Sequence, residues 1–290
     1  QTNSKYMPYA KKLNSLEATT DIDHALRNAD MILFAIPCQA LRGFLLQIKD
    51  KLPEKALLIN LAKGIEIDSL DTASQIFATA LGKKALERYV ILSGPTFSKE
   101  LFLGYPTGAT VAGTNLKNAQ NVQKTLGTKY FRLYTAKDFV GVELGGALKN
   151  VMAIGVGIAD GLGYGLNTRA GLITRCLHES IELGLAMGAK ERTFSGLSGI
   201  ADLLLTCTGD LSRNRQVGLR LGQGESLEKI TKSMNAVAEG IPTAKSVYAL
   251  MQKHGIDMPN AEHTYRILYE NMPAKKAVES LLKRELKRES

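Results

Sequence analysis

The stretch GVELGGALKNVMAIGVGIA, residues 141–159, is apolar over nearly its whole length and holds a single lysine, Lys149. Its only other residues with polar side chains are Glu143 and Asn150. A helix that is hydrophobic almost all round is a buried helix, so the pattern predicts one at 139–159. Lysine is seldom fully buried without a partner, because taking its charge out of water is costly. The ammonium group of this lysine therefore needs an explanation.

On the N-terminal side of this helix, short apolar runs alternate with helical patterns. The runs predict strands at 31–37, 56–62, 88–94, 108–113 and 130–136. The segments between and before them predict helices at 21–28, 39–51, 69–81 and 116–126. Nearly continuous apolar strands that alternate with helices indicate a parallel sheet covered on both faces.

From residue 139 onward the strand patterns stop and only helical patterns remain. They lie at 139–159, 168–188, 197–206, 213–221, 226–232, 239–254, 260–270 and 274–288. A chain of 290 residues suits two domains, and we place the boundary near residue 138. The prediction is an α/β domain at 1–138 followed by an all-helical domain at 139–290.

Three of the predicted strands end in residues that could build a site. They are followed by Pro37 and Cys38, by Lys63 and Gly64, and by the segment 94–96. In doubly wound sheets, ligands bind beyond the carboxyl ends of the strands, which favours a binding site at this edge. Glycine and proline also punctuate ordinary turns, so the pattern alone leaves both interpretations open.

The glycine pattern G-x-G-x-x-G, which holds a dinucleotide between a first strand and its helix, does not occur in the sequence. Gly161, Gly163 and Gly165 form a glycine cluster, but they follow a helical pattern and not a strand. They therefore predict a connection between two helices. If the α/β domain is of the dinucleotide-binding type, we expect its first βαβ unit to precede Gln1.

Composition narrows the classes of function. The formal net charge of +9 suits an anionic ligand, but no stripe of aromatic and basic residues accompanies it and tryptophan is absent, so nucleic-acid binding is disfavoured. Four scattered histidines lack metal-ligand spacing, and we expect no metal site. Three widely spaced cysteines indicate reduced thiols of a cytoplasmic protein. No uninterrupted apolar run reaches the ~18–20 residues of a membrane helix.

Asp202 and Thr206 lie four residues apart in SGIADLLLTC, residues 198–207, and so share one helix face. We expect this face to meet something polar, although Asp202 could instead only favour the dipole of the first turn. For Lys149, one interpretation is a buried ion pair with a carboxylate. The other is a lysine whose pKa is lowered by burial, so that it donates and accepts protons near neutral pH. Carbonyl reduction needs such a group beside the developing alkoxide.

The segment TGDLSRNRQVG, residues 208–218, combines a helix start at Ser212 with Arg213 and Asn214. The N–H groups of a helix start, together with a guanidinium and an amide, make a good cradle for an anion. Such a compact cluster fits a phosphorylated small molecule better than a nucleic acid. An exposed basic turn is the alternative interpretation.

Several motifs follow one another in the order of a known family. They are FAIPCQALR (34–42), NLAKGIE (60–66), LSGPTFSKE (92–100), VELGGALKNVMAI (142–154), SGIADLLLTCTGDLSRNRQVG (198–218) and VAEG (237–240). Over essentially its whole length the chain resembles the NAD(P)-dependent glycerol-3-phosphate dehydrogenases of the bacterial type. The opening NSKYMP, residues 3–8, resembles the segment that follows the first βαβ unit in that family.

The resemblance implies a Rossmann-like domain without its first βαβ unit, followed by an all-α substrate domain. It also implies reversible reduction of dihydroxyacetone phosphate to sn-glycerol 3-phosphate by NADH or NADPH, with Lys149 as the general acid and base. The residues that it places at the substrate are Lys63, Gly94, Thr96, Lys149, Asn150, Asp202, Thr206, Ser212, Arg213 and Asn214. The residues that it places at the cofactor are Lys63, Ser98, Arg213, Val237 and Glu239.

The sequence departs from the family in three places near this site, because Cys38 stands where serine is usual, Ser98 where alanine is common and Gly209 where serine is frequent. We expect a cytoplasmic homodimer that supplies glycerophospholipid synthesis. Two alternatives stay open. A related two-domain dehydrogenase of another substrate would need a different anion-binding block, and a non-catalytic paralogue would keep the phosphosugar pocket but not the cofactor site.

Overall fold

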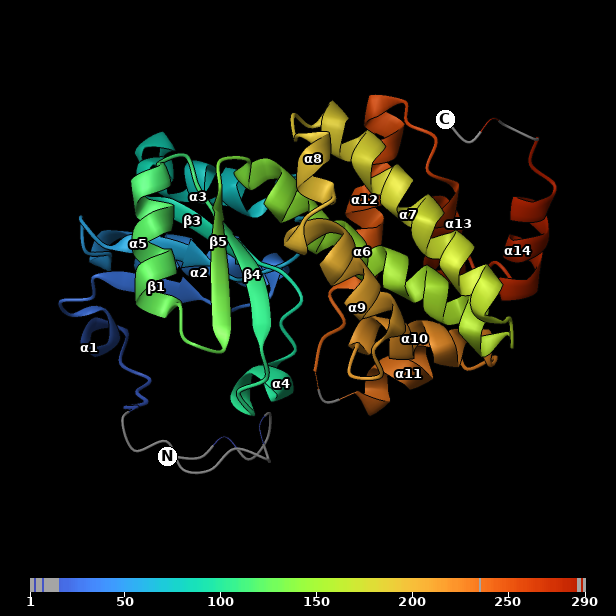
Figure 1. Ribbon diagram of the computed structural model, residues 1–290, viewed down its shortest axis with the longest axis horizontal. Helices are drawn as coiled ribbons and strands as arrows, with labels where there is room; N and C mark the ends of the chain where they lie inside the picture. Colours follow the sequence, from blue (N-terminus) through green and yellow to red (C-terminus); the bar gives the residue numbers. More distant parts are fainter. Residues whose placement is uncertain (1–2, 4–6, 8–15, 235, 286–287, 289–290) are drawn as a thin grey trace.

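Figure 1 shows the computed structural model of the chain, in which an α/β half and a helical half lie side by side. The structure describes residues 3, 7, 16–234, 236–285 and 288. Among these residues, five strands form one sheet in the order β1-β2-β3-β4-β5. The strands are β1 (Met31–Phe34), β2 (Leu57–Asn60), β3 (Tyr89–Ser93), β4 (Thr107–Ala112) and β5 (Phe131–Ala136).

The sheet is mixed, which corrects the expectation of a wholly parallel sheet. β1, β2 and β3 are parallel to one another, and β4 is parallel to β5, but β3 and β4 are antiparallel. Parallel neighbours need a crossover connection, usually a helix that runs the length of the sheet. Between β3 and β4 the chain has only the five-residue helix α4 (Ser98–Phe102), which is too short for that return. The chain therefore reverses direction at this point.

Helices cover both faces of the sheet, as expected. α2 (Cys38–Ile48) and α3 (Ala73–Leu81) pack on one face, and α5 (Leu116–Leu126) packs on the other. Leu58 belongs to the first core and Ile59 to the second, because successive side chains of a strand point to opposite faces. The remaining short elements of this half are α1 (Ile22–Leu26), η1 (Lys49–Lys51) and η2 (Lys83–Arg88).

The long helix α6 (Phe139–Gly161) leads from the sheet into the helical half and forms its centre (Figure 1). The other helices of this half are α7 (Leu166–Ala186), α8 (Glu191–Phe194), η3 (Leu197–Ala201), α9 (Asp202–Thr208), α10 (Arg213–Gly222), α11 (Leu227–Ser233), α12 (Gly240–His254), α13 (Pro259–Tyr269) and α14 (Ala274–Leu282). Among the described residues, α6 is the one helix long and apolar enough to cross a membrane. Because 83% of an apolar 18-residue stretch of α6 is buried inside the protein, α6 is a core helix.

The order of the elements follows the prediction from sequence, with a few differences. The sequence patterns do not predict the short helices α4, η2 and α8. Helix α14 ends at Leu282, short of the predicted residue 288, and residues 286–287 lie outside the described part of the chain. The prediction for the glycine cluster is confirmed, because Gly163 lies between α6 and α7 with a φ of +86°. The motif at 3–8 also lies outside the described residues, apart from Asn3 and Met7.

The change from strands to helices occurs where the sequence predicts the domain boundary. The last strand ends at Ala136 and α6 begins at Phe139, next to residue 138. The division into two domains remains a prediction. Asp138 caps the start of α6, since its carboxylate accepts a hydrogen bond from the Gly141 N–H at 3.0 Å.

Glu143 is buried and fixes α6 against the α/β half. Its carboxylate accepts hydrogen bonds from the N–H and the hydroxyl of Ser74, both at 2.9 Å, and from the Tyr89 hydroxyl. Ser74 lies in the first turn of α3, so the carboxylate also meets the positive end of that helix. Burial raises the pKa of Glu143, although these hydrogen bonds oppose the change. The helix that carries Lys149 is thereby held in one position against β3 and α3.

Candidate active site

Lys149 forms a buried ion pair with Asp202. Its Nζ lies 2.6 Å from Oδ1 of Asp202 and 2.8 Å from the hydroxyl oxygen of Thr206. Lys149 is 8% exposed and Asp202 is 1% exposed. The Thr206 hydroxyl donates in turn to the Asp202 carbonyl oxygen at 2.6 Å. The polar face that the sequence predicts on this helix therefore meets the lysine, and the ion-pair interpretation of Lys149 describes its contacts correctly.

A second lysine, from the α/β half, binds the same carboxylate. Lys63 follows β2, and its Nζ lies 2.7 Å from Oδ2 of Asp202. It also donates to the Gly94 carbonyl oxygen at 2.9 Å, which accepts from the Thr96 hydroxyl at 3.2 Å. The ends of β2 and β3 thus meet α6 and α9 at the carboxyl edge of the parallel strands. This is the edge at which the residues after the strands predict a site.

The three charged groups leave an excess of one positive charge, since two ammonium groups share one carboxylate. Burial above all, and then the charge of Lys63, lower the pKa of Lys149 to about 8, although Asp202 opposes them. A group with such a pKa can release and take up a proton near neutral pH. Surplus positive charge in a buried cluster also stabilises an anion or a developing alkoxide.

Two glycines let α6 approach the segments that carry this cluster. A Cβ at Gly145 would lie 2.4 Å from the Ser198 carbonyl oxygen, and one at Gly146 would lie 2.7 Å from the Ser93 hydroxyl oxygen. Both separations are far shorter than van der Waals contact. A larger residue at either position would therefore push η3 or β3 away from the lysine pair.

An irregular turn before α9 aims Asp202 at the two lysines. η3 has the wide hydrogen bonding of a π-helix, and Gly199 within it has a φ of −99° and a ψ of −107°. A Cβ at Gly199 would lie 2.1 Å from the Phe194 carbonyl oxygen, so only glycine fits. Turns of this kind are frequent at functional sites. Asp202 also occupies the first turn of α9, where the helix dipole stabilises a negative charge. Both sequence-based interpretations of Asp202 therefore describe its position.

Asn150 and Asn214 connect the helical half to the segment that carries Lys63. The amide of Asn214 donates to Oδ1 of Asn150 at 2.9 Å, and the amide of Asn150 donates to the Lys63 carbonyl oxygen at 3.2 Å. Oδ1 of Asn214 accepts from the Gly240 N–H at 2.9 Å. Both asparagines are buried. They belong to the same contiguous cluster as the lysine pair.

The predicted anion cradle lies at the start of α10. Ser212 caps this helix, because its hydroxyl oxygen accepts a hydrogen bond from the Arg215 N–H at 3.2 Å. Arg213 is exposed at the first position of the helix. Burial raises the pKa of Glu239, while a hydrogen bond from the Cys38 backbone and the charge of Arg213 oppose that rise. The guanidinium of Arg213 is therefore within electrostatic reach of Glu239.

The surroundings of Gly64 fit a bound polar group such as part of a dinucleotide. Oε2 of Glu239 and the hydroxyl of Thr243 are buried without a hydrogen-bond partner in the described part of the chain. A Cβ at Gly64 would lie 3.4 Å from the first of these atoms and 3.3 Å from the second. Buried polar atoms are almost always hydrogen-bonded, so unpaired ones beside a strand end indicate a ligand. The residues present therefore fit the cofactor that the sequence resemblance implies.

Besides Arg213, two of the predicted cofactor residues are exposed. Ser98 is exposed at the first position of α4, and Val237 is exposed just before α12. The roles of all the predicted site residues remain predictions.

Sequence analysis missed Arg215 and its partners. Its guanidinium pairs with Asp160 at 2.8 Å and with Asp210 at 2.9 Å, and Asp160 also pairs with Arg169 at 2.9 Å. Arg215 thereby ties the turn before α10 to the end of α6, which fixes the position of Arg213. The motif SRNR indicates that its two arginines have different partners, because they are two residues apart and cannot lie on the same helix face.

Within the described residues, no group of three or more His, Cys, Asp or Glu side chains could hold a metal ion. All three cysteines are free and buried. Burial raises the pKa of Cys38 and of Cys207 to about 12 in each case. Thiols of this kind are unreactive, because the thiolate is the nucleophile.

A sheet with parallel strands, a helical half built on one buried helix, and a lysine pair where the two halves meet are together typical of two-domain dehydrogenases that use a dinucleotide. Comparison with known proteins narrows this class. A family model described as NAD-dependent glycerol-3-phosphate dehydrogenase N-terminus matches residues 1–119, and one described as the C-terminus of the same enzyme matches residues 138–279. The chain belongs to the NAD-dependent glycerol-3-phosphate dehydrogenase family.

Individual relatives agree with this assignment. The chain is 47% identical over 287 residues to a glycerol-3-phosphate dehydrogenase (NAD(P)+) of Geobacter sp., covering 99% of this chain and 86% of that protein. It is 49% identical to the enzyme of the same name from Solidesulfovibrio magneticus, covering 99% of this chain and 87% of that protein. The crystal structure of glycerol-3-phosphate dehydrogenase from Coxiella burnetii superimposes with a TM-score of 0.92 at 34% identity, over 97% of this chain and 86% of that one.

Proposed function

We propose that this protein interconverts dihydroxyacetone phosphate and sn-glycerol 3-phosphate with NADH or NADPH. The observation that carries the proposal is the carboxylate of Asp202, which Lys63 and Lys149 share at 2.7 and 2.6 Å. Such a cluster suits a reaction in which negative charge develops on a carbonyl oxygen and a proton must follow. The names of the relatives, and the large share of each that this chain covers, support the same activity.

Lys149 moves the proton in this mechanism. The nicotinamide ring supplies the hydride when the dinucleotide is bound. As C2 of the ketone is reduced, the carbonyl oxygen gains negative charge, and the ammonium of Lys149 donates a proton to it. An O–H bond forms and Lys149 becomes a neutral amine. In the direction of oxidation the neutral amine takes the hydroxyl proton back, while Asp202 and Thr206 hold its Nζ in place.

Lys63 has a different task, because Asp202 and the Gly94 carbonyl oxygen hold its Nζ beside Lys149, where it supplies positive charge. Its charge balances that of Asp202 when Lys149 has become neutral, so the cluster then carries no net negative charge. The Gly94 carbonyl holds Lys63 in this position, and Thr96 lies on the same carbonyl. We place Gly94 and Thr96 in the wall of the substrate pocket.

The phosphate group of the substrate is assigned to the start of α10. Arg213 supplies an exposed guanidinium that can bind a phosphate with two parallel hydrogen bonds. Asn214 uses one amide N–H on Asn150 and keeps a second N–H for a ligand. The Ser212 hydroxyl accepts the capping hydrogen bond and still has its own proton to donate.

The cofactor is assigned to the surroundings of Gly64. Glu239 supplies an unpaired carboxylate oxygen, and Lys63 and Arg213 supply positive charge for an anionic dinucleotide. Ser98 and Val237, both exposed, complete the residues that we assign to the cofactor. These assignments rest on the unpaired buried oxygens and on the resemblance to the family.

The test is the oxidation of NADH or NADPH in the presence of dihydroxyacetone phosphate, followed by absorbance for the wild-type protein and for Lys149→Met. We expect kcat to fall by about 10²–10⁴-fold in the variant, as for the loss of a general acid. The fold should survive, because Asp202 keeps Lys63 as its partner. Lys253→Met, an exposed change on α12, serves as the control and should keep wild-type kcat.

Two outcomes would contradict the proposal. Near-normal turnover of Lys149→Met would remove this lysine from the chemistry. Wild-type protein that binds dihydroxyacetone phosphate in calorimetry without turning it over would favour the non-catalytic alternative instead. We further propose that the protein is a cytoplasmic homodimer, which cell fractionation and light scattering on the purified protein would test.

A further inference from the structure

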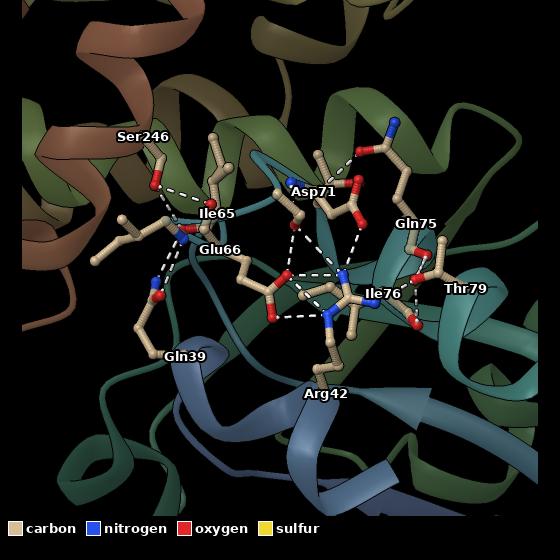
Figure 2. Close-up of polar contacts among 12 residues, drawn as sticks. Gln39, Arg42, Ile65, Glu66, Asp71, Gln75, Ile76, Thr79 and Ser246 are labelled. Carbon is tan, nitrogen blue, oxygen red and sulfur yellow. Dashed lines mark hydrogen bonds and ion pairs between the residues drawn. The ribbon is translucent and has the colours of Figure 1, made fainter. Parts of the chain in front are cut away.

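The segment 61–72, between β2 and α3, contains neither a helix nor a strand, yet both halves of the protein hold its backbone. Figure 2 shows these contacts. The Ile65 carbonyl oxygen accepts hydrogen bonds from Ser246 of α12 and from Gln39 of α2, both at 2.9 Å. Oε1 of Gln39 also accepts from the Ile67 N–H at 3.0 Å. Because Lys63 lies in this segment, its position depends on these contacts.

Arg42 of α2 binds the side chains of two acidic residues in the same segment, Glu66 and Asp71 (Figure 2). We call this contact the clamp. Nη2 of Arg42 lies 2.7 Å from Oε2 of Glu66 and 2.7 Å from Oδ2 of Asp71, and its Nε donates to Glu66 at 2.9 Å. Its Nη1 donates to the Thr79 hydroxyl at 2.6 Å, which ties the clamp to α3. Burial by itself raises the pKa of the Glu66 carboxyl, but hydrogen bonds from Arg42 and Ser69 outweigh it and hold that pKa below its usual value.

The clamped turn has an unfavourable backbone conformation. Leu70, between the two acidic residues that Arg42 binds, has a φ of +61°. A branched side chain in this left-handed region is strained, and the surrounding contacts must maintain it. The side chains of Ile65 and Leu70 pack in the apolar core of the helical half, whereas Glu66 and Asp71 are held by the α/β half. The segment is thus fixed to both halves at once.

We infer that Arg42 is a positioning residue for the reaction, because its clamp on Glu66 and Asp71 holds Lys63 in place. Through the segment it keeps Lys63 against Asp202 and close to Lys149, without touching either the substrate or the cofactor. As regards activity, this role rests on the proposed function. As regards geometry, it rests only on the contacts of the segment.

Loss of the clamp has a consequence of known sign at Lys149. If Lys63 moves away, its repulsion of the Lys149 ammonium weakens. Asp202 then has one ammonium partner fewer and favours the charge of Lys149 more strongly. Both changes raise the pKa of Lys149 above its value of about 8. A residue that only stabilised the fold would not produce this shift.

The test compares Arg42→Ala with the control Arg88→Ala. Arg88 belongs to the same half, and its guanidinium donates to the Pro53 and Ala56 carbonyl oxygens at 2.6 and 3.1 Å. These residues precede β2, whereas Lys63 follows its other end. The protein is labelled with ¹³C-lysine, and the ε-carbon signal of Lys149 is assigned from its loss in Lys149→Met. We expect the titration midpoint of Lys149 to rise by about one pH unit in Arg42→Ala and to stay unchanged in Arg88→Ala.

Activity provides the second measurement. In Arg42→Ala we expect kcat for ketone reduction to fall by at least about tenfold, because a small displacement of a catalytic group is costly. The pH at which kcat declines should also rise, by the same amount as the titration midpoint of Lys149. Because the titration requires no turnover, it decides the role of Arg42 even if dihydroxyacetone phosphate is not the substrate. A lower melting temperature without a shift of the Lys149 titration would overturn the inference.

A milder variant covers the case in which Arg42→Ala does not fold. Glu66→Gln keeps the size of the side chain and removes its charge, so Arg42 retains Asp71 as its partner. We expect the titration midpoint of Lys149 to rise here too, but by less than in Arg42→Ala. A midpoint that stays at the wild-type value in Glu66→Gln as well as in any folded Arg42 variant would overturn the positioning role.

Discussion

Lys63 and Lys149 come from opposite halves of the protein and contact the two oxygens of one carboxylate, Asp202, at 2.7 and 2.6 Å. Two ammonium groups stay this close in a buried place only because the negative charge lies between them. The arrangement makes Lys149 a stronger acid than an ordinary lysine, with a pKa of about 8 that burial and the charge of Lys63 produce. The Lys63 ammonium also balances the charge of Asp202 when Lys149 is neutral.

The rates of the two directions of reaction should change with pH in opposite ways. Reduction of the ketone requires the ammonium form of Lys149, so its rate should fall as pH rises through about 8. Oxidation requires the neutral amine, so its rate should rise over the same interval. Initial rates from roughly pH 6 to 10, spanning this pKa on both sides, provide the measurement. Lys149→Arg should lose both inflections, because a guanidinium stays charged throughout, and parallel changes in the two directions would rule out Lys149 as the proton carrier.

Arg213→Ala should weaken substrate binding without damage to the fold. The guanidinium is exposed, and a hydrogen bond to a charged group contributes about 1.5–3 kcal/mol, which corresponds to a rise of roughly 10–100-fold in KM for dihydroxyacetone phosphate. Arg220→Ala on the same helix is the matched control, since Arg220 is bound to Glu225 at 2.8 Å and is assigned no part in the site. Equal KM values in the two variants would show that the substrate phosphate does not bind at the start of α10.

Glu143→Gln should destabilise the protein. A neutral amide has one acceptor oxygen, so it cannot accept from Tyr89 and from both donors of Ser74 as the carboxylate does. A buried donor left without its partner costs about 1–3 kcal/mol, and we expect the free energy of unfolding in urea to fall by that amount. Tyr89→Phe removes one donor together with its need for a partner, and should cost less. A Glu143→Gln protein as stable as the wild type would mean that this carboxylate does not hold α6 to the sheet.

Glu179 of α7 should make the stability of the helical half depend on pH. Its carboxylate accepts hydrogen bonds from the Asn260 N–H at 2.8 Å and from the Ala261 N–H at 3.1 Å, at the start of α13. Burial raises the pKa of Glu179 from 4.5 to about 7. Because the folded-state pKa lies above the unfolded one, its contribution to stability is complete below about pH 4.5 and is lost as pH rises through about 7.

The size of this effect is roughly 3 kcal/mol, from 1.36 kcal/mol for each unit of pKa. Urea unfolding of the wild type and of Glu179→Gln, compared over roughly pH 4 to 8 to bracket both pKa values, isolates the contribution of this one group. The wild type should lose more stability than the variant over that interval. The opposite slope, or the same slope in both proteins, would contradict the role of Glu179.

Much of the fold is predictable from local pattern. The helix at 116–126 has the bounds that its apolar spacing predicts, and the start of α6 at Phe139 agrees with the end of the strand patterns. The antiparallel pairing of β3 with β4 is not predictable in this way, because both strands read as continuous apolar runs. Their direction depends on whether the intervening chain can cross the sheet, and that chain holds only the short helix α4.

The candidate site divides along similar lines. Lys149 stands out because it is the single lysine of an apolar helix, and Asp202 because its helix has a single polar face. Their partnership with Lys63 through one carboxylate joins residues from three segments far apart in the chain. The roles of Arg42, Glu143 and Arg215 are not predictable in this way, since they depend on partners from distant segments of the chain.

Sequence alone was sufficient for the class of the two halves, for the buried helix and its lysine, and for the family resemblance, because helical and strand periodicity and short motifs are properties of neighbouring residues. The packing in three dimensions decided the direction of β4, the sharing of Asp202 by two lysines and the clamp of Arg42 on the segment 61–72. Those features depend on which distant surfaces can approach, and the close contacts at Gly145, Gly146 and Gly199 determine that approach.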